Sequence, residues 1–186
     1  MSSPLILGVD PGFSGAYTLI FPDDTLTIYD MPTYIVSVTK SKKVRKDGTR
    51  GTRTKRDYNR AVIASTLRAL HVLHPDMVLW VEKIWAVPAK GDGVHQGAQS
   101  IFDQGRGYEM WLTMAACLKI RLEEVAPVRW KKEMMKDCGE GKAASVKRAQ
   151  AMFPGYANLF TGPRGGALDG RADSALIAKY GQLQTF

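Results

Sequence analysis

The chain has few of the residues and patterns that mark exported, membrane-bound or thiol-dependent proteins. Among its 186 residues there are only two cysteines, Cys117 and Cys138, whose spacing fits neither a metal-ligand motif nor a disulfide framework. No apolar run approaches the length of a membrane span, and the N-terminus lacks the basic region and cleavage site of a secretory signal. We therefore expect a protein of a reducing compartment that is neither secreted nor held in a membrane.

Histidine is also scarce, and internal repeats and interdomain linkers are absent. The three histidines, His71, His74 and His95, do not form a ligand cluster. A hydrophobic content of 45% and a charged content of 24% are ordinary for a globular protein. Because 186 residues suffice to bury one full core, we expect a single domain over residues 1–186.

What the sequence does contain is an excess of positive charge confined to one segment. Ten of its 26 lysines and arginines, but only two of its 18 acids, lie between Lys40 and Arg60, so this segment carries the whole net charge of +8. Interspersed glycines and threonines predict a mobile loop or a long hairpin, suited to bind a polyanion. A solvated basic loop or a localisation signal is the simpler alternative.

The order of apolar and turn-forming residues predicts an α/β fold. Three β-prone runs separated by turns, then two apolar runs further along the chain, predict strands at 5–10, 16–21, 25–29, 77–81 and 122–126. Helical periodicity predicts helices at 57–73 (with Asp57 as its cap), 99–118, 128–136, 142–153 and 168–180. We expect a five-stranded mixed sheet, three antiparallel strands then two parallel, with helices on both faces. A glycine-rich stretch at 89–97 is expected to form a loop over the site.

Four acids stand at strand ends or at the start of a helix. Asp10 follows the first strand, and Glu82 ends the fourth strand. Since these two strands would lie side by side at the centre of the sheet, we expect both carboxylates at matching ends. Asp169 and Asp173 are four residues apart on the last predicted helix, so both can face the same direction.

Four converging carboxylates repel one another unless a divalent cation holds them together. Two such ions about 3.5–4 Å apart would activate a water for attack on a phosphodiester and stabilise the leaving oxygen. Ligands that are oxygen only favour Mg²⁺ or Mn²⁺ over zinc. We therefore expect Asp10, Glu82, Asp169 and Asp173 to be catalytic and metal-binding. Separate structural roles are the alternative, with Asp10 in its turn, Glu82 paired to Lys83 and Asp169 capping the helix.

The segments around these acids resemble the RuvC Holliday junction resolvases of the RNase H-like superfamily. The motifs that match are Gly8-Val-Asp10-Pro-Gly12, Val81-Glu82-Lys-Ile-Trp85 and Asp169-Gly-Arg-Ala-Asp173-Ser-Ala-Leu-Ile-Ala178. The similarity spans nearly the whole chain. The bacterial pattern places the partner acid or histidine three residues before the last Asp, where this chain has Gly170. Its form looks more like divergent phage-type or organellar-type members.

The resemblance implies an RNase H-like nuclease domain and a Mg²⁺-dependent crossover junction endodeoxyribonuclease, a hydrolase of DNA recombination and repair. It implies a homodimer that binds four-way or branched DNA and nicks two opposed strands symmetrically, with two Mg²⁺ ions per site that Mn²⁺ can replace. No membrane and no nucleotide cofactor are expected. A cytoplasmic or nucleoid-associated location is expected, in the host cytoplasm for a viral protein, and an organelle is the alternative.

The resemblance also assigns individual residues. Asp10, Glu82 and Asp173 fall on the metal-binding acids of the family. Trp85 falls where the family has an aromatic residue that stacks at the strand exchange, for which burial in the core is the alternative. Lys131 and Lys142 correspond to lysines near the scissile phosphate.

The chain departs from the bacterial pattern in a basic insertion at about 38–58, between the third strand and the first helix. In a dimer this insertion could grip a junction arm by charge, without base readout, or alter the choice of substrate toward branched replication intermediates. The DNA-binding residues expected in it are Lys42, Lys43, Arg45, Lys46, Arg50, Arg53, Lys55 and Arg56.

Three competing functions stay open from the sequence. The first is a broader nuclease that acts on flaps, forks or branched packaging DNA. The second is a phosphotransferase, because the turn from Asp10 to Gly15 also suits the phosphate-binding turn of sugar kinases and actin-like ATPases, although those enzymes need two such domains. The third is a junction-binding protein without catalysis, which the presence of all candidate ligands disfavours.

Overall fold

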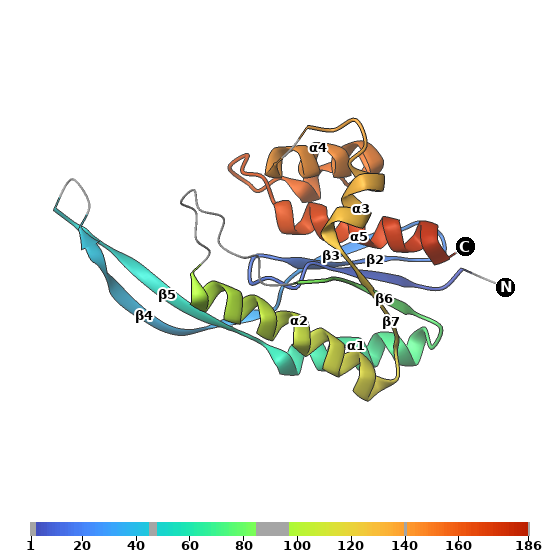
Figure 1. Cartoon of the computed structure of the whole chain (residues 1–186), viewed down its shortest axis with the longest axis horizontal. Coiled ribbons are helices and arrows are strands. Elements are labelled where there is room, and N and C mark those ends of the chain that lie inside the picture. The colour runs from blue at the N-terminus through green and yellow to red at the C-terminus, as the bar shows by residue number, and fades with distance from the viewer. Residues whose placement is uncertain (1–2, 45–47, 85–96, 140, 186) are drawn as a thin grey trace.

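A five-stranded mixed sheet forms the centre of the molecule in the computed structural model, which describes residues 3–44, 48–84, 97–139 and 141–185 (Figure 1). The strands are β1 (Ile6–Val9), β2 (Ala16–Ile20), β3 (Leu26–Asp30), β6 (Val78–Glu82) and β7 (Arg121–Val125), in the order β3-β2-β1-β6-β7. Strands β1 to β3 pair antiparallel, β6 runs parallel to β1, and β7 runs parallel to β6. The predicted sheet is confirmed.

Helices cover both faces of this sheet, as predicted. The helices α1 (Arg60–Leu73) and α2 (Ala98–Leu118) lie on one face, and α3 (Pro127–Met134), α4 (Lys142–Met152) and α5 (Asp169–Thr185) lie on the other (Figure 1). A short 3-10 helix, η1 (Pro154–Phe160), was not predicted. Within the described part of the chain, no helix combines the length and apolar character needed to cross a bilayer.

Side-chain alternation along the strands divides the core into two layers. On β1 and just before it, Leu5, Leu7 and Val9 pack with α1 and α2, whereas Ile6 packs with α3 to α5. Gly8 faces α5 so closely that a Cβ at this position would collide with the backbone nitrogen of Ala178. The absence of a side chain therefore lets α5 lie directly against the central strand, which fixes the helix that carries two of the four acids.

The basic segment forms a hairpin that projects from the body of the molecule (Figure 1). Its strands, β4 (Thr33–Val44) and β5 (Arg50–Tyr58), pair antiparallel in a separate two-stranded sheet. The ladder is interrupted by irregularities between Ile35 and Ser37 and between Lys40 and Val44. The expected insertion at about 38–58 thus forms most of a hairpin that already begins at Thr33.

The start of the first helix is a correction to the sequence prediction. The helix was expected from Asp57, with Asp57 as its cap, but α1 begins at Arg60, and the side chain of Asn59 accepts a hydrogen bond from Val62 N at 3.3 Å. Asp57 instead pairs with Tyr34 in the hairpin ladder, and its carboxylate forms an ion pair with Arg106 at 2.7 Å. This tertiary partner on α2, which local sequence does not indicate, holds Asp57 in the strand.

Candidate active site

Asp10 lies in the turn that follows β1, between the sheet and the start of α5. Its side chain accepts a hydrogen bond from Gly12 N at 3.2 Å, so the local turn role considered from the sequence is present. Burial, and next the negative charge of Glu82, raise the pKa of Asp10 from 3.8 to about 7. Asp173 and Asp169 raise this pKa further.

Glu82 is the last residue of β6 and lies beside Asp10 at the end of the neighbouring strand, because Val9 and Val81 are partners in the parallel register. The fully buried Trp130 of α3 donates a hydrogen bond from Nε1 to the Glu82 carboxylate at 3.0 Å. Burial raises the pKa of Glu82, and the Trp130 hydrogen bond and the charge of Lys131 oppose this rise. Trp130 therefore holds this carboxylate in place, a role that sequence reasoning missed.

Asp169 and Asp173 come from the first two turns of α5. One carboxylate oxygen of Asp173 is shielded from solvent, and its charge acts on both Asp10 and Glu82. Gly170 lies between them, where a Cβ would collide with the backbone oxygen of Ser14. In this arrangement of the turn and α5, position 170 has no room for a side chain.

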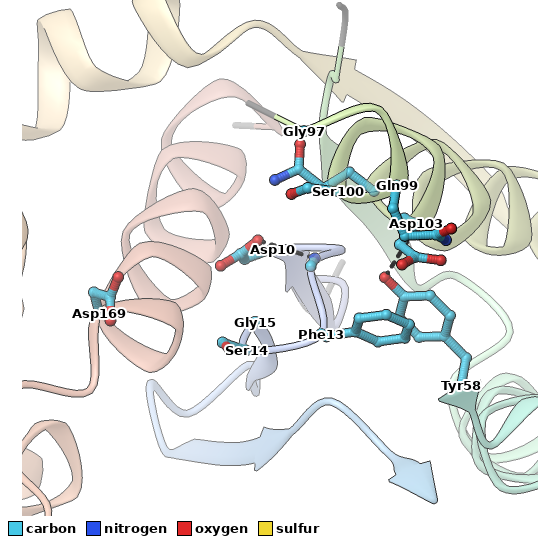
Figure 2. Close-up of a pocket in the computed structure, with 12 residues that line it drawn as sticks. Asp10, Phe13, Ser14, Gly15, Tyr58, Gly97, Gln99, Ser100, Asp103 and Asp169 are labelled. Carbon is cyan, nitrogen blue, oxygen red and sulfur yellow. Dashed lines mark hydrogen bonds between the residues drawn. The ribbon is translucent and has the colours of Figure 1, made fainter. Parts of the chain in front are cut away.

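A cavity of about 590 Å³ opens over Asp10 and Asp169. Figure 2 shows Asp10 near its centre, with Asp169 on one side and Tyr58 with Asp103 on the other. The buried Tyr58 hydroxyl lies 3.1 Å from the backbone oxygens of Pro11 and Asp103, so it ties the hairpin base to the turn after Asp10. Asp103 and Tyr58 were not predicted to line the site, because their approach depends on tertiary packing.

The chemistry of the four acids fits hard divalent cations. They supply oxygen ligands only, and burial, followed by the charges of the other three acids, raises the pKa of Asp10 and so opposes its ionisation. Within the described ranges, no three Asp, Glu, His or Cys side chains are gathered closely enough to form a finished ligand cluster. The charges of Glu82, Asp173 and Asp169 all act on Asp10, so the four carboxylates share one electrostatic environment.

The structure describes some of the other predicted site residues in full, some by their backbone only and some not at all. The Nζ atom of Lys131 on α3 lies 5.1 Å from the centre of the Trp130 ring. Its positive charge partly opposes the rise in the pKa of Glu82 that burial causes. Lys55, Arg56 and Arg50 are exposed on β5. Trp85, Arg45, Lys46 and the loop expected at 89–97, except its last residue, lie outside the described residues; for Lys42, Lys43, Arg53 and Lys142 only the backbone is described.

Comparisons with known proteins agree with this fold. No family model matches the sequence, and no curated protein matches it. T. thermophilus RuvC, solved in complex with a Holliday junction substrate, superposes with a TM-score of 0.50 at 11% identity, over 97% of this chain and 97% of that chain. The yeast mitochondrial Holliday junction resolvase Ydc2 superposes with a TM-score of 0.51 at 15% identity, over 99% of this chain and 82% of its own. The chain therefore has the RuvC-type, RNase H-like fold that its motifs predicted.

Proposed function

We propose that this protein is a divalent-cation-dependent endonuclease that resolves four-way DNA junctions by symmetric nicking of two opposed strands. The observation that supports the proposal is that Asp10 and Glu82 follow one another across the two central strands and that the charges of Glu82, Asp169 and Asp173 all act on Asp10. The same kind of fold occurs in two Holliday junction resolvases, which supports junctions as the substrate. The basic hairpin beside the site supports a polyanionic substrate.

Each acid would serve as a ligand for Mg²⁺ or Mn²⁺. Asp10 lies in the turn after β1, Glu82 ends β6, and Asp169 and Asp173 stand on the helix packed against the sheet, so the four carboxylates come from three segments of the chain. When bound, two such cations would supply an activated water and stabilise negative charge on the leaving oxygen. Trp130 keeps Glu82 oriented, and Lys131 offers a positive charge for a phosphate beside Glu82.

Two opposed nicks require two equivalent sites, which a homodimer with a two-fold axis provides. We propose this assembly together with the function, since one chain contributes one set of the four acids. A nuclease of forks or flaps would need only one active site per substrate. The number of coupled nicks therefore separates the two interpretations of the same chemistry.

The test is incubation of the purified protein with a synthetic four-way junction, a fork, a flap and plain duplex, each with Mg²⁺ and with a chelator. We expect paired nicks at symmetric positions of the junction in Mg²⁺ or Mn²⁺ only. Equal nicking of duplex, or nicking in the chelator, would contradict the proposal. Preference for the fork or flap would assign the broader branched-DNA nuclease instead.

A further inference from the structure

A second cavity adjoins the acidic one and extends along the hairpin. Its volume is about 550 Å³, and it shares Phe13, Ser14, Gln99 and Asp103 with the cavity over Asp10. Its other walls come from both strands of the hairpin, with Ser37 and Thr39 on β4 and Thr54, Lys55 and Arg56 on β5. The two cavities form one continuous depression from the acids to the hairpin, and we call the hairpin half, with these nine lining residues, the hairpin groove.

The chemistry of the hairpin groove suits a phosphodiester backbone. Lys55 and Arg56 supply positive charge, and three hydroxyl side chains of the hairpin lie among them. In the ladder Ser37 is the partner of Lys55, and Thr39 follows two residues later on the same face of β4. Cations and hydroxyls together are the common partners of phosphate oxygens in DNA complexes.

The negative charge of Asp103, the acid that lines the hairpin groove, is partly neutralised by Arg106. Asp103 accepts a hydrogen bond from Arg106 at 3.2 Å, and the same guanidinium bonds Asp57 at 2.7 Å. Because one arginine is shared by two carboxylates at the rim, Asp103 presents less negative charge to a phosphate than an isolated acid would. The groove is therefore cationic on its hairpin side, and Asp103 adds a partly neutralised negative charge where the groove meets the cavity over Asp10.

An aromatic contact lies where the cavity over Asp10 meets the hairpin groove. Phe13, which lines both cavities, stacks on Tyr58 with ring centres 4.3 Å apart. Tyr58 ends β5 and is held by the carbonyl oxygens of Pro11 and Asp103. Since Tyr58 closely follows Lys55 and Arg56 along β5, the part of the strand that carries these two cations is anchored beside the turn after Asp10.

We propose that the hairpin groove holds the DNA strand that is cleaved, with Lys55 and Arg56 on phosphates a few nucleotides from the scissile phosphate. This inference rests on the proposed function and deepens it, because it assigns the base of the hairpin to the reacting strand and not to a distant junction arm.

The test compares two variants that each remove two positive charges from the hairpin. Lys55→Ala/Arg56→Ala changes the groove, and Lys40→Ala/Arg50→Ala changes exposed residues that do not line it. Both are made in an Asp10→Asn background, and binding is measured in Ca²⁺ to junctions in which single phosphates near the nick are replaced by uncharged methylphosphonates. Lys55→Gln/Arg56→Gln repeats the comparison with longer side chains, and circular dichroism checks folding.

We expect one or two methylphosphonate positions near the nick to weaken binding about tenfold, because the uncharged group no longer attracts the lysine or arginine beside it. This effect should disappear in Lys55→Ala/Arg56→Ala and persist in Lys40→Ala/Arg50→Ala. An unchanged methylphosphonate profile in the groove variant would overturn the inference. Cleavage of the unmodified junction is measured separately with the protein that keeps all four acids. Absence of nicking in that assay would contradict the proposed function. The methylphosphonate binding profile would still show whether the hairpin groove holds the DNA strand.

Discussion

At the scale of single residues, Asp10 links the electrostatics of the site to the stability of the protein. Its pKa is raised from 3.8 to about 7 in the folded state, chiefly by burial and then by Glu82. The folded protein thus holds this proton more tightly than the unfolded chain. The resulting stabilisation is complete below about pH 4 and is lost as the pH rises through 7.

This shift predicts a pH-dependent effect of Asp10→Asn, which keeps an acceptor for Gly12 N but cannot ionise. In a chelator at pH 8 the variant should be more stable than the parent by on the order of 1–4 kcal/mol, with no difference near pH 4. Urea unfolding at pH 4, 6 and 8 measures the difference. The exposed Asp76→Asn serves as control and should have no such dependence. Equal stability of parent and Asp10→Asn at pH 8 would contradict the raised pKa.

Cation binding should offset the loss of stability that comes from ionising Asp10 in the folded protein. At pH 8, Mg²⁺ or Mn²⁺ at about one hundred times its dissociation constant should stabilise the parent by about 2.7 kcal/mol, because it binds the folded site and not the unfolded chain. Asp10→Asn and Glu82→Gln should gain much less. Thermal melts over a cation titration provide the measurement. A similar gain in the parent and both variants would place the cation elsewhere.

A substitution at Trp130 can remove one hydrogen bond to Glu82 while keeping a buried aromatic ring. Trp130→Phe removes the donor to Glu82, so we expect about a tenfold lower cleavage rate, a higher Mg²⁺ requirement and unchanged junction binding. Trp111→Phe is the matched control, because Trp111 is also buried and its Nε1 has no hydrogen-bond partner among the described residues. Equal effects of both substitutions on the Mg²⁺ requirement would make Trp130 a packing residue only.

The positions of the four acids in the fold could be predicted from the sequence, because Asp10 and Glu82 lie at the ends of apolar runs and Asp169 and Asp173 lie on the last predicted helix; their roles stay predictions. The residues that support these acids could not be predicted. Trp130 is 48 positions from Glu82, and the approach of Tyr58 to Pro11 spans 47 positions, so neither contact leaves a local pattern. Such supporting contacts are decided by how helices and strands pack.

At the scale of elements, the hairpin was predicted only as one of two possibilities, and the helix after it was predicted to start at Asp57, whereas α1 begins at Arg60. Hairpins without a third strand are marginally stable in water, so local propensity alone does not fix them. Here Asp57 is bound by Arg106 and Tyr58 is buried against Phe13, which anchors the hairpin base to the body. By contrast β1, β2 and β6 are continuous apolar runs buried almost throughout, and their strands were correctly predicted.

The charge of the hairpin predicts the salt dependence of DNA binding. Replacing Lys42, Lys43, Arg45 and Lys46 by serine should weaken junction binding and lower the slope of log affinity against log salt by about 0.9 for each phosphate that the variant no longer neutralises. Titrations between about 50 and 200 mM salt measure the slope. Arg68→Ala, exposed on α1, is the control for a change in net charge. An unchanged slope would assign the hairpin another role.

At the scale of the whole molecule, the proposed homodimer predicts a specific result for mixed subunits. A dimer of one intact chain and one Asp10→Asn chain has a single competent site, so it should nick one strand of a junction and leave the opposed strand intact. Co-expression with two different tags isolates this heterodimer, and denaturing gels score the nicks. Dimers of two intact chains are the control. Paired nicks from the heterodimer would show that one site serves both strands.

Gly170 has a consequence for how this kind of site can change through mutation. A side chain there would meet the backbone of the turn at Ser14, so the acid of the last helix cannot be moved forward by a single substitution. Gly170→Asp would displace the very turn that holds Asp10. A version of this chain with an acid at position 170 would therefore need matched changes in two distant segments, the last helix and the turn at Ser14.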